Sequence, residues 1–109
     1  MSDKPHSVSI RPAASASKKY TAVFYNKEGK KIKTTHFGFK SQKDPNNDFT
    51  KHGDESRKQR YLDRHRAREN WNAPMTAGAL SRWLLWNKRS FNASKSDYLK
   101  RFNLKSKKF

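Results

Sequence analysis

Residues 20–25 (YTAVFY) are rich in β-forming side chains, with Tyr20, Ala22 and Phe24 on one face, and they give the first clear structural signal in this chain. Period-two alternation of β-branched and aromatic residues predicts a half-buried strand. Residues 26–29 (NKEG) follow, and Gly29 is well placed for the left-handed position of a hairpin loop. We expect the return strand at about residues 30–37. Because an isolated hairpin is only marginally stable in water, this one must pack on other elements.

Helical patterns follow a loop that we expect at residues 38–53, where Phe39 and Phe49 are possible anchors into the core. Residues 54–70 contain neither Gly nor Pro and are expected to form the first helix, with acidic residues in its first turn. A second helix is expected at about residues 77–87, after Thr76 as N-cap, and a short third one from a capping box at Ser94. The expected buried sides of the last two helices are Leu80, Trp83 and Leu84, with Asn87 on the same face, and Tyr98, Leu99 and Phe102.

These elements predict an α+β fold in which an N-terminal β-hairpin packs on two or three short helices. Residues 1–19 are rich in Ser, Ala and Pro, and this composition predicts a flexible basic N-terminal arm. Such an arm could reach along nucleic acid, serve as a solubilising tail, or become ordered only inside an assembly. We therefore expect the arm at residues 1–19, a single small α+β domain at 20–104 and a basic tail at 105–109.

Charge decides which partners fit this fold. The chain has 26 Lys and Arg against 9 Asp and Glu, a net charge of +17, whereas solubility requires a net charge of only roughly 2–8 in a small domain. A compact fold with this charge repels itself and is stabilised beside a polyanion. Aromatic residues make up 13% of the sequence, which favours a small aromatic core over a wholly disordered chain.

Several classes of protein are excluded or disfavoured by composition. The chain has no Cys, which excludes disulfides and the commonest structural zinc sites. No apolar run approaches the ~18–20 residues of a transmembrane helix, and the N-terminus lacks the apolar centre of a signal peptide. No hydrolase, P-loop or zinc-protease motif appears. We expect a protein that is not secreted, is not an enzyme, and has no cofactor, metal or small-molecule substrate.

The first predicted helix concentrates the positive charge. On a helical wheel Arg57, Arg60, Arg64 and Arg68 fall within an arc of roughly 80°, beside a neighbouring arc of Tyr61, Leu62 and His65. Arginine forks match phosphate oxygens and stay charged at ordinary pH. The alternative is a solvated face, or arginines paired with acids folded close by. The candidate polyanion-binding residues are Arg57, Arg60, Arg64 and Arg68 of this helix, Lys31 and Lys33 of the return strand, and Lys18 and Lys19 of the arm.

The tryptophans Trp71, Trp83 and Trp86 have two possible roles. They could stack on unpaired bases, as aromatic platforms do in proteins that bind single strands. Core packing or a protein interface is the favoured interpretation, because Trp83 lies on the apolar arc of the second helix while Trp86 and Leu85 point elsewhere. No sequence signature of a known nucleic-acid-binding module is present, so binding is expected to show little sequence preference.

Three strings of sequence, KKIKTTHFG, RKQRYLDRHRARENW and PMTAGALSRWLLWNK, carry a resemblance. They resemble a family of small basic proteins of unknown function encoded by large nucleocytoplasmic DNA viruses, including algal and giant viruses. The likeness covers about three quarters of the chain and leaves out residues 1–19. It implies a viral origin and a place in the virion or the infected host cell, and it supplies no active site.

Two functions therefore stand beside each other. The first is a sequence-nonspecific nucleic-acid-binding protein of a large DNA virus that is associated with the virion, with DNA rather than RNA as the expected partner. The alternative is a minor capsid or scaffold protein that lines the inner face of the capsid, where its basic surface meets acidic capsid proteins, anionic lipid or the genome. A nonstructural factor that interacts with the host is a third reading.

Overall fold

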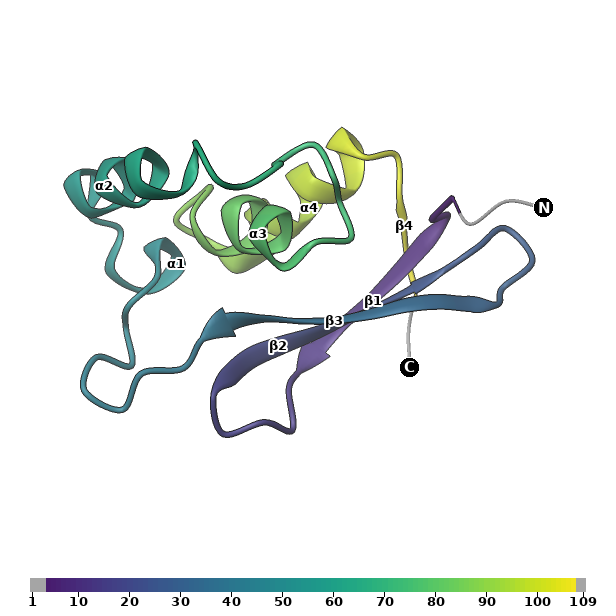
Figure 1. Cartoon of the computed structure of the whole chain (residues 1–109), viewed down its shortest axis with the longest axis horizontal. Coiled ribbons are helices and arrows are strands. Elements are labelled where there is room, and N and C mark those ends of the chain that lie inside the picture. The colour runs from purple at the N-terminus through teal and green to yellow at the C-terminus, as the bar shows by residue number, and fades with distance from the viewer. Residues whose placement is uncertain (1–3, 108–109) are drawn as a thin grey trace.

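The helices lie on one face of a four-stranded sheet in the computed structural model, which describes residues 4–107 (Figure 1). This is the α+β fold that the sequence predicted. In chain order the elements are strands β1 (Ser7–Pro12), β2 (Lys18–Tyr25) and β3 (Lys31–Phe39), helices α1 (Phe49–His52), α2 (Glu55–His65) and α3 (Ala77–Leu80), the π-helix η1 (Ser81–Leu85), helix α4 (Phe91–Arg101) and strand β4 (Lys105–Ser106).

The sheet has the strand order β3-β2-β1-β4. Strands β1, β2 and β3 are antiparallel neighbours, and β4 runs parallel to β1. The predicted hairpin is formed by β2 and β3, and Gly29 takes the expected left-handed conformation with φ of 84°. The turn is closed by Asn26, whose N–H donates to the Lys30 carbonyl at 2.8 Å and whose side-chain oxygen accepts from the Lys30 N–H at 2.9 Å.

The prediction of a flexible arm at residues 1–19 is wrong for Ser7–Pro12, which form strand β1 between β2 and β4, and for Lys18 and Lys19, which begin β2. The alternation of Ser, Val, Ser and Ile at residues 7–10 suits a strand, but the surrounding Ser, Ala and Pro obscured it. Val8 pairs with Phe24 and is fully buried. The basic tail expected from residue 105 likewise begins as strand β4. Residues 1–3 of the expected arm and 108–109 of the tail lie outside the described residues.

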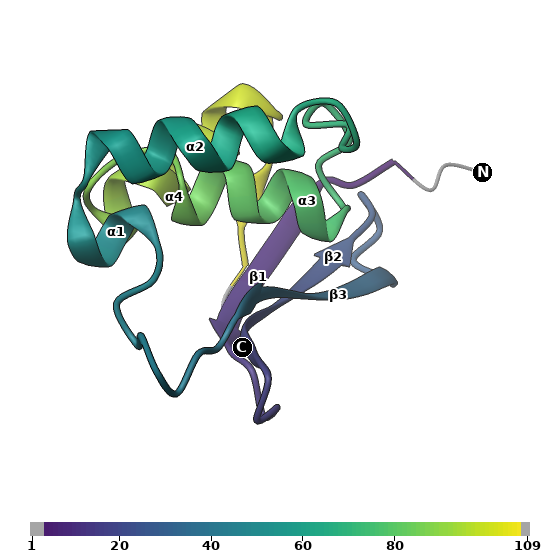
Figure 2. The same ribbon diagram turned by 60° about the vertical axis from the view of Figure 1, so that its left-hand side comes forward.

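The core lies between the sheet and the helices, and Figure 2 shows α2 stacked above α3, with the sheet below them. Leu85, which we expected to point away from the apolar arc of the second helix, is also buried. The reason is that the second helix continues as η1, where the Trp86 N–H donates to the Ser81 carbonyl at 3.1 Å. This wider turn changes which side chains face inward. The buried core residues are Val8, Ala22, Phe24, Phe37, Leu80, Leu84, Leu85, Tyr98 and Leu104.

Helix boundaries differ from the prediction in two places. Helix α2 ends at His65 rather than near residue 70. Helix α4 begins at Phe91, where the Ser90 hydroxyl accepts from the Ala93 N–H. The prediction of a capping box at Ser94 is therefore wrong. Ser94 is a buried residue within this helix, and its hydroxyl accepts from the Lys88 N–H at 3.0 Å.

The N-cap predicted at Thr76 is confirmed, whereas Asp54, which was expected in the first turn of its helix, is the N-cap of α2. The Asp54 carboxylate accepts from the N–H groups of Ser56 and Arg57 at the start of α2. The Thr76 hydroxyl accepts from the Ala79 N–H at 3.2 Å at the start of α3. These caps satisfy N–H groups that have no partner inside a helix. They fix where α2 and α3 begin, and so place the arginines of α2 relative to the sheet.

Candidate nucleic-acid interface

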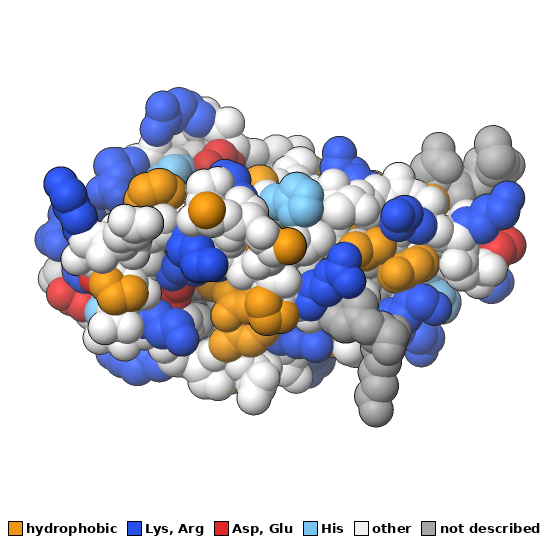
Figure 3. All heavy atoms as spheres, turned by 90° about the horizontal axis from the view of Figure 1, so that it is seen from below, with side chains coloured by type: hydrophobic (Ala, Val, Ile, Leu, Met, Phe, Trp, Pro, Cys, Tyr) orange, Lys and Arg blue, Asp and Glu red, His pale blue; other side chains and the backbone are white. Residues whose placement is uncertain are grey.

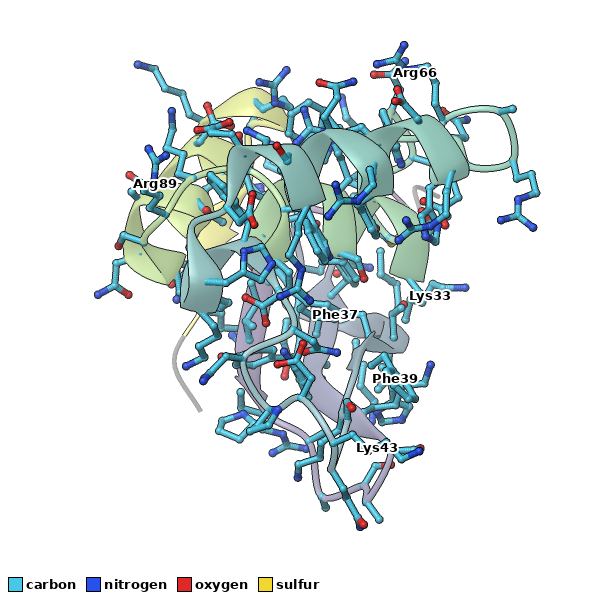
Figure 4. All side chains as sticks on the ribbon, turned by 90° about the vertical axis from the view of Figure 1, so that its left-hand side faces the viewer. Lys33, Phe37, Phe39, Lys43, Arg66 and Arg89 are labelled. Atoms are coloured by element: carbon cyan, nitrogen blue, oxygen red, sulfur yellow. The ribbon has the colours of Figure 1, made fainter. Side chains whose placement is uncertain are left out.

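A cleft of about 590 Å³ lies between α2 and the nearby ends of β2 and β3. We call it the α2–β3 cleft. Figure 4 views this side of the molecule, with α2 above and Phe37 and Phe39 of β3 below it. Five of the eight predicted polyanion-binding residues line the cleft, although they come from segments far apart in sequence. They are Lys18 and Lys19 at the start of β2 and Arg57, Arg60 and Arg64 of α2.

Two of these five cations are held by acids of the same chain. The Lys19 ammonium forms an ion pair with the buried carboxylate of Asp48, which also caps α1. Arg57 forms an ion pair with Asp44 at 2.9 Å, and this pair is partly exposed, so it contributes only about 0–1 kcal/mol. Both pairs hold their cations in place at the cleft.

The other three cations of the cleft have no ion pair with a described acid. Among residues 4–107, no ion pair involves Lys18, Arg60 or Arg64, and all three side chains are exposed. Glu69 is an acid that also lines the cleft. One of its oxygens contacts His65 Nδ1 at 2.7 Å and the other accepts from the Trp71 indole at 3.0 Å. Glu69 is thus committed to internal contacts.

Aromatic rings form the inner wall of the cleft. Tyr61 stacks on Trp86 with centroids 4.4 Å apart and planes 4° from parallel, and on its other side it stacks on His65 at 4.2 Å. Burial raises the pKa of the Tyr61 hydroxyl well above its usual range. Tyr61 therefore stays neutral beside the cations, and the stack fixes α2 against the end of η1.

Phe39 lies at the end of β3 and lines the cleft. Its exposed fraction is 67%, and it is the one large hydrophobic side chain among the described residues that is exposed. The expectation that it anchors the loop in the core is therefore wrong, whereas Phe49, the other expected anchor, is buried. The sequence carried no signal for this exposure, because it depends on how far the helices extend over the sheet.

Three predicted polyanion-binding residues do not line the cleft. Arg68 lies in the turn that follows α2, and its N–H donates to the His65 carbonyl at 3.1 Å. Lys31 and Lys33 are exposed on β3 near the hairpin turn. Lys33 precedes Phe37 and Phe39 along β3 and lies nearer the hairpin turn. The structure therefore separates the predicted cations into a cleft group and an outlying group.

The three tryptophans also fall into two groups. Trp83 lies between the guanidinium groups of Arg82 and Arg101, whose central carbons are 4.2 Å and 3.8 Å from its ring centroid. Its indole donates to the Trp71 carbonyl at 2.8 Å. Trp71 and Trp83 thus support one another away from the cleft, and Trp86 alone of the three lines it.

Positive charge alone does not distinguish the cleft from the rest of the surface. Figure 3, which views the opposite face of the sheet, shows Lys and Arg side chains across that face as well, with few acids among them. What distinguishes the cleft is that unpaired cations and aromatic rings line one hollow. Within residues 4–107, no group of three His, Asp or Glu side chains is placed to hold a metal ion. In the same residues, no helix is both long and apolar enough to span a bilayer.

The sequence profile of a family of unknown function, DUF5754, matches residues 8–65. The chain belongs to this family. The match runs from β1 to the last residue of α2, and so it contains all five cations of the cleft and Phe39. No curated protein and no solved structure matches the chain. The family has no assigned function, so the viral origin and the place in the virion stay predictions.

Proposed function

We propose that this member of the DUF5754 family is a non-enzymatic protein that binds the phosphate backbone of nucleic acid in the α2–β3 cleft, without reading base sequence. The observation that carries the proposal is the convergence of five cations on one hollow, three of which have no ion pair with a described residue. Each arginine guanidinium group can bind two phosphate oxygens at once, and each lysine ammonium group adds a single point charge.

Electrostatic repulsion within the cleft supports this proposal. Arg60 and Arg64 are one helical turn apart on α2, and like charges at this spacing destabilise a helix slightly. Lys18 adds a third positive charge from the sheet side. Salt weakens this repulsion, because the Debye length at physiological ionic strength is only about 8 Å. A bound polyanion would remove this repulsion and release its own counterions, which favours association.

An acidic capsid protein, the alternative partner, would also be attracted to these cations. A broad protein face would meet the rim of the hollow and the outlying cations, whereas a phosphate chain can follow its interior. The structure therefore favours nucleic acid as the first partner to test. A protein partner is an outcome that the experiment below can reveal.

The test is a salt titration of binding to random-sequence oligonucleotides, measured by fluorescence anisotropy. The cleft variant is Arg60→Gln with Arg64→Gln. Its matched control is Arg66→Gln with Arg68→Gln, which removes the same charge from two residues that do not line the cleft. Figure 4 shows Arg66 pointing away from β3. The cleft variant should lose at least about tenfold in affinity, and its log–log salt slope should fall by roughly 1.4–1.8, or about 0.7–0.9 per lost phosphate contact.

Three results would refute the proposal. One is the absence of salt-sensitive binding by the unaltered chain. Another is an equal loss in the cleft and control variants, since binding would then depend on total charge rather than on the cleft. Tighter binding to an acidic polypeptide than to any oligonucleotide would refute it in favour of the protein partner.

A further inference from the structure

We infer that the α2–β3 cleft takes an unpaired strand of nucleic acid rather than a duplex, and that Phe39 is the surface on which a base stacks. This inference rests on the proposed function and adds the kind of nucleic acid to it. It joins three observations, namely the size of the hollow, the exposure of Phe39, and the position of Lys18 beside that ring.

The size of the cleft favours a thin ligand. Its volume of about 590 Å³ lies within the roughly 300–1,000 Å³ of pockets that enclose small molecules. A duplex, whose major groove alone is about 12 Å wide, is too thick to enter and would touch only the rim. A single strand can place one or two nucleotides inside, with its phosphates near Arg60 and Arg64.

The binding of phosphate groups alone does not require an exposed aromatic ring such as that of Phe39. A single exposed apolar residue is ordinary on a protein surface. Phe39 differs because its ring, 67% exposed, lines a hollow with unpaired cations. Bases in a duplex are already stacked and hidden, whereas those of a single strand are free to stack on aromatic side chains. The combination of a basic groove with an aromatic platform is typical of proteins that bind single strands.

The backbone holds Phe39 in a fixed place. Phe39 is the register partner of Lys18 on the neighbouring strand, and its carbonyl accepts from the Asn47 side-chain amide at 3.1 Å. The Lys40 N–H donates to the Ser17 carbonyl at 2.9 Å, which extends the pairing by one more residue. A cation without a described ion pair is thus fixed opposite the ring. A nucleotide could stack its base on Phe39 while its phosphate meets Lys18.

The experiment compares four ligands by equilibrium binding to the full chain. They are oligothymidine and oligouridine of about 20 nucleotides, which exceeds the roughly 4–16 nucleotides that one small binding domain covers, a duplex of the same length, and inorganic polyphosphate. The variants are Phe39→Leu, which keeps an apolar side chain without a ring, and Phe39→Trp, which enlarges the stacking surface. Because the ring is exposed, both variants should melt at the temperature of the unaltered chain.

The unaltered chain should bind oligothymidine at least about tenfold more tightly than the duplex. Phe39→Leu should weaken binding to oligothymidine and oligouridine by about 5- to 100-fold, and Phe39→Trp should preserve or tighten it. Binding to polyphosphate and to the duplex should change by less than about twofold, because these ligands offer no free base. Oligodeoxyuridine, which differs from oligouridine only in the sugar, would assign any difference between the two oligonucleotides to the sugar and so to DNA or RNA.

The inference is overturned if the duplex binds as tightly as oligothymidine, or if Phe39→Leu weakens all four ligands equally. Polyglutamate, measured beside the four ligands as an acidic-polypeptide control, also overturns the inference if it binds as tightly as oligothymidine, since the partner would then be an acidic protein. These failures differ from failure of the proposed function. If the arginine variants still lose oligonucleotide binding while Phe39→Leu does not, only the single-strand inference is wrong. If the unaltered chain binds no nucleic acid, both are wrong.

Discussion

Replacing Gly38 with alanine should destabilise the fold more than the same change at Gly29. Both glycines have φ of 84°, so each alanine suffers the same left-handed backbone strain of about 1–2 kcal/mol. The surroundings of the two differ. A Cβ at Gly38 would lie 2.9 Å from Leu85 Cδ1 and 3.0 Å from Lys19 Cβ, whereas a Cβ at Gly29 has no heavy atom of this kind within 4 Å.

The magnitude follows from adding these two contributions. Overpacking a well-filled site costs about 1–3 kcal/mol, and Leu85 cannot yield easily because it is buried in the core. Gly38→Ala should therefore lower the free energy of unfolding by about 2–5 kcal/mol, and Gly29→Ala by about 1–2 kcal/mol. The total for a domain is about 5–15 kcal/mol, so Gly38→Ala would remove a large share of it.

The measurement is equilibrium unfolding in urea, followed by tryptophan fluorescence. Parallel m-values for the two variants would show that the change lies in stability rather than in the compactness of the unfolded state. If the two substitutions lower the free energy of unfolding equally, the close packing of β3 against η1 is refuted. If only Gly38→Ala also weakens oligonucleotide binding, the displaced Lys19 connects this packing to the cleft.

Two further predictions concern buried tyrosines. Tyr98 is fully buried and its hydroxyl donates to the Pro74 carbonyl at 2.7 Å, so Tyr98→Phe should lower the free energy of unfolding by about 1–2 kcal/mol by leaving that carbonyl unpaired; an unchanged urea midpoint would contradict this. Burial raises the pKa of Tyr61, so the folded state keeps a proton that the unfolded state loses above about pH 10. Stability should therefore fall as pH rises above about 10, and Tyr61→Phe should make that loss smaller in urea unfolding between about pH 9 and about pH 11. The lowered pKa of Lys58 has the opposite effect on stability in this pH range. If the free energy of unfolding falls equally steeply with pH in Tyr61→Phe and in the unaltered chain, the contribution assigned to Tyr61 is refuted.

Local patterns in the sequence were enough to predict the hairpin, the start of α2 and the arc of arginines. Each of these depends on residues within a few positions of one another. The run of β-branched and aromatic residues at 20–25 marks β2, and Asp54 caps the N–H groups two and three residues on. The spacing of Arg57, Arg60 and Arg64 places them on one side of α2 whatever surrounds the helix. The positive charge is likewise a property of composition.

Features that depend on distant partners were not predictable in this way. Strand β1 exists because β2 and β4 supply its hydrogen-bond partners, which a short alternation inside a Ser- and Ala-rich segment does not reveal. The π-turn of η1 turns Leu85 inward against the sheet. The end of α4 packs on the core through Tyr98, as predicted. The helix starts earlier than predicted, at Phe91, because Ser94 lies within it and its hydroxyl accepts a hydrogen bond from the Lys88 N–H.

The sequence by itself therefore determined that this protein carries a large positive charge and an arginine face on one helix. Only the tertiary structure decided that Lys18 and Lys19 lie across a hollow from Arg60 and Arg64, and that Phe39 remains exposed beside them. The physical reason is that charge and helical spacing are set by neighbouring residues. A cleft, in contrast, is the space left between elements that pack elsewhere, and its shape is fixed by contacts far apart in the chain.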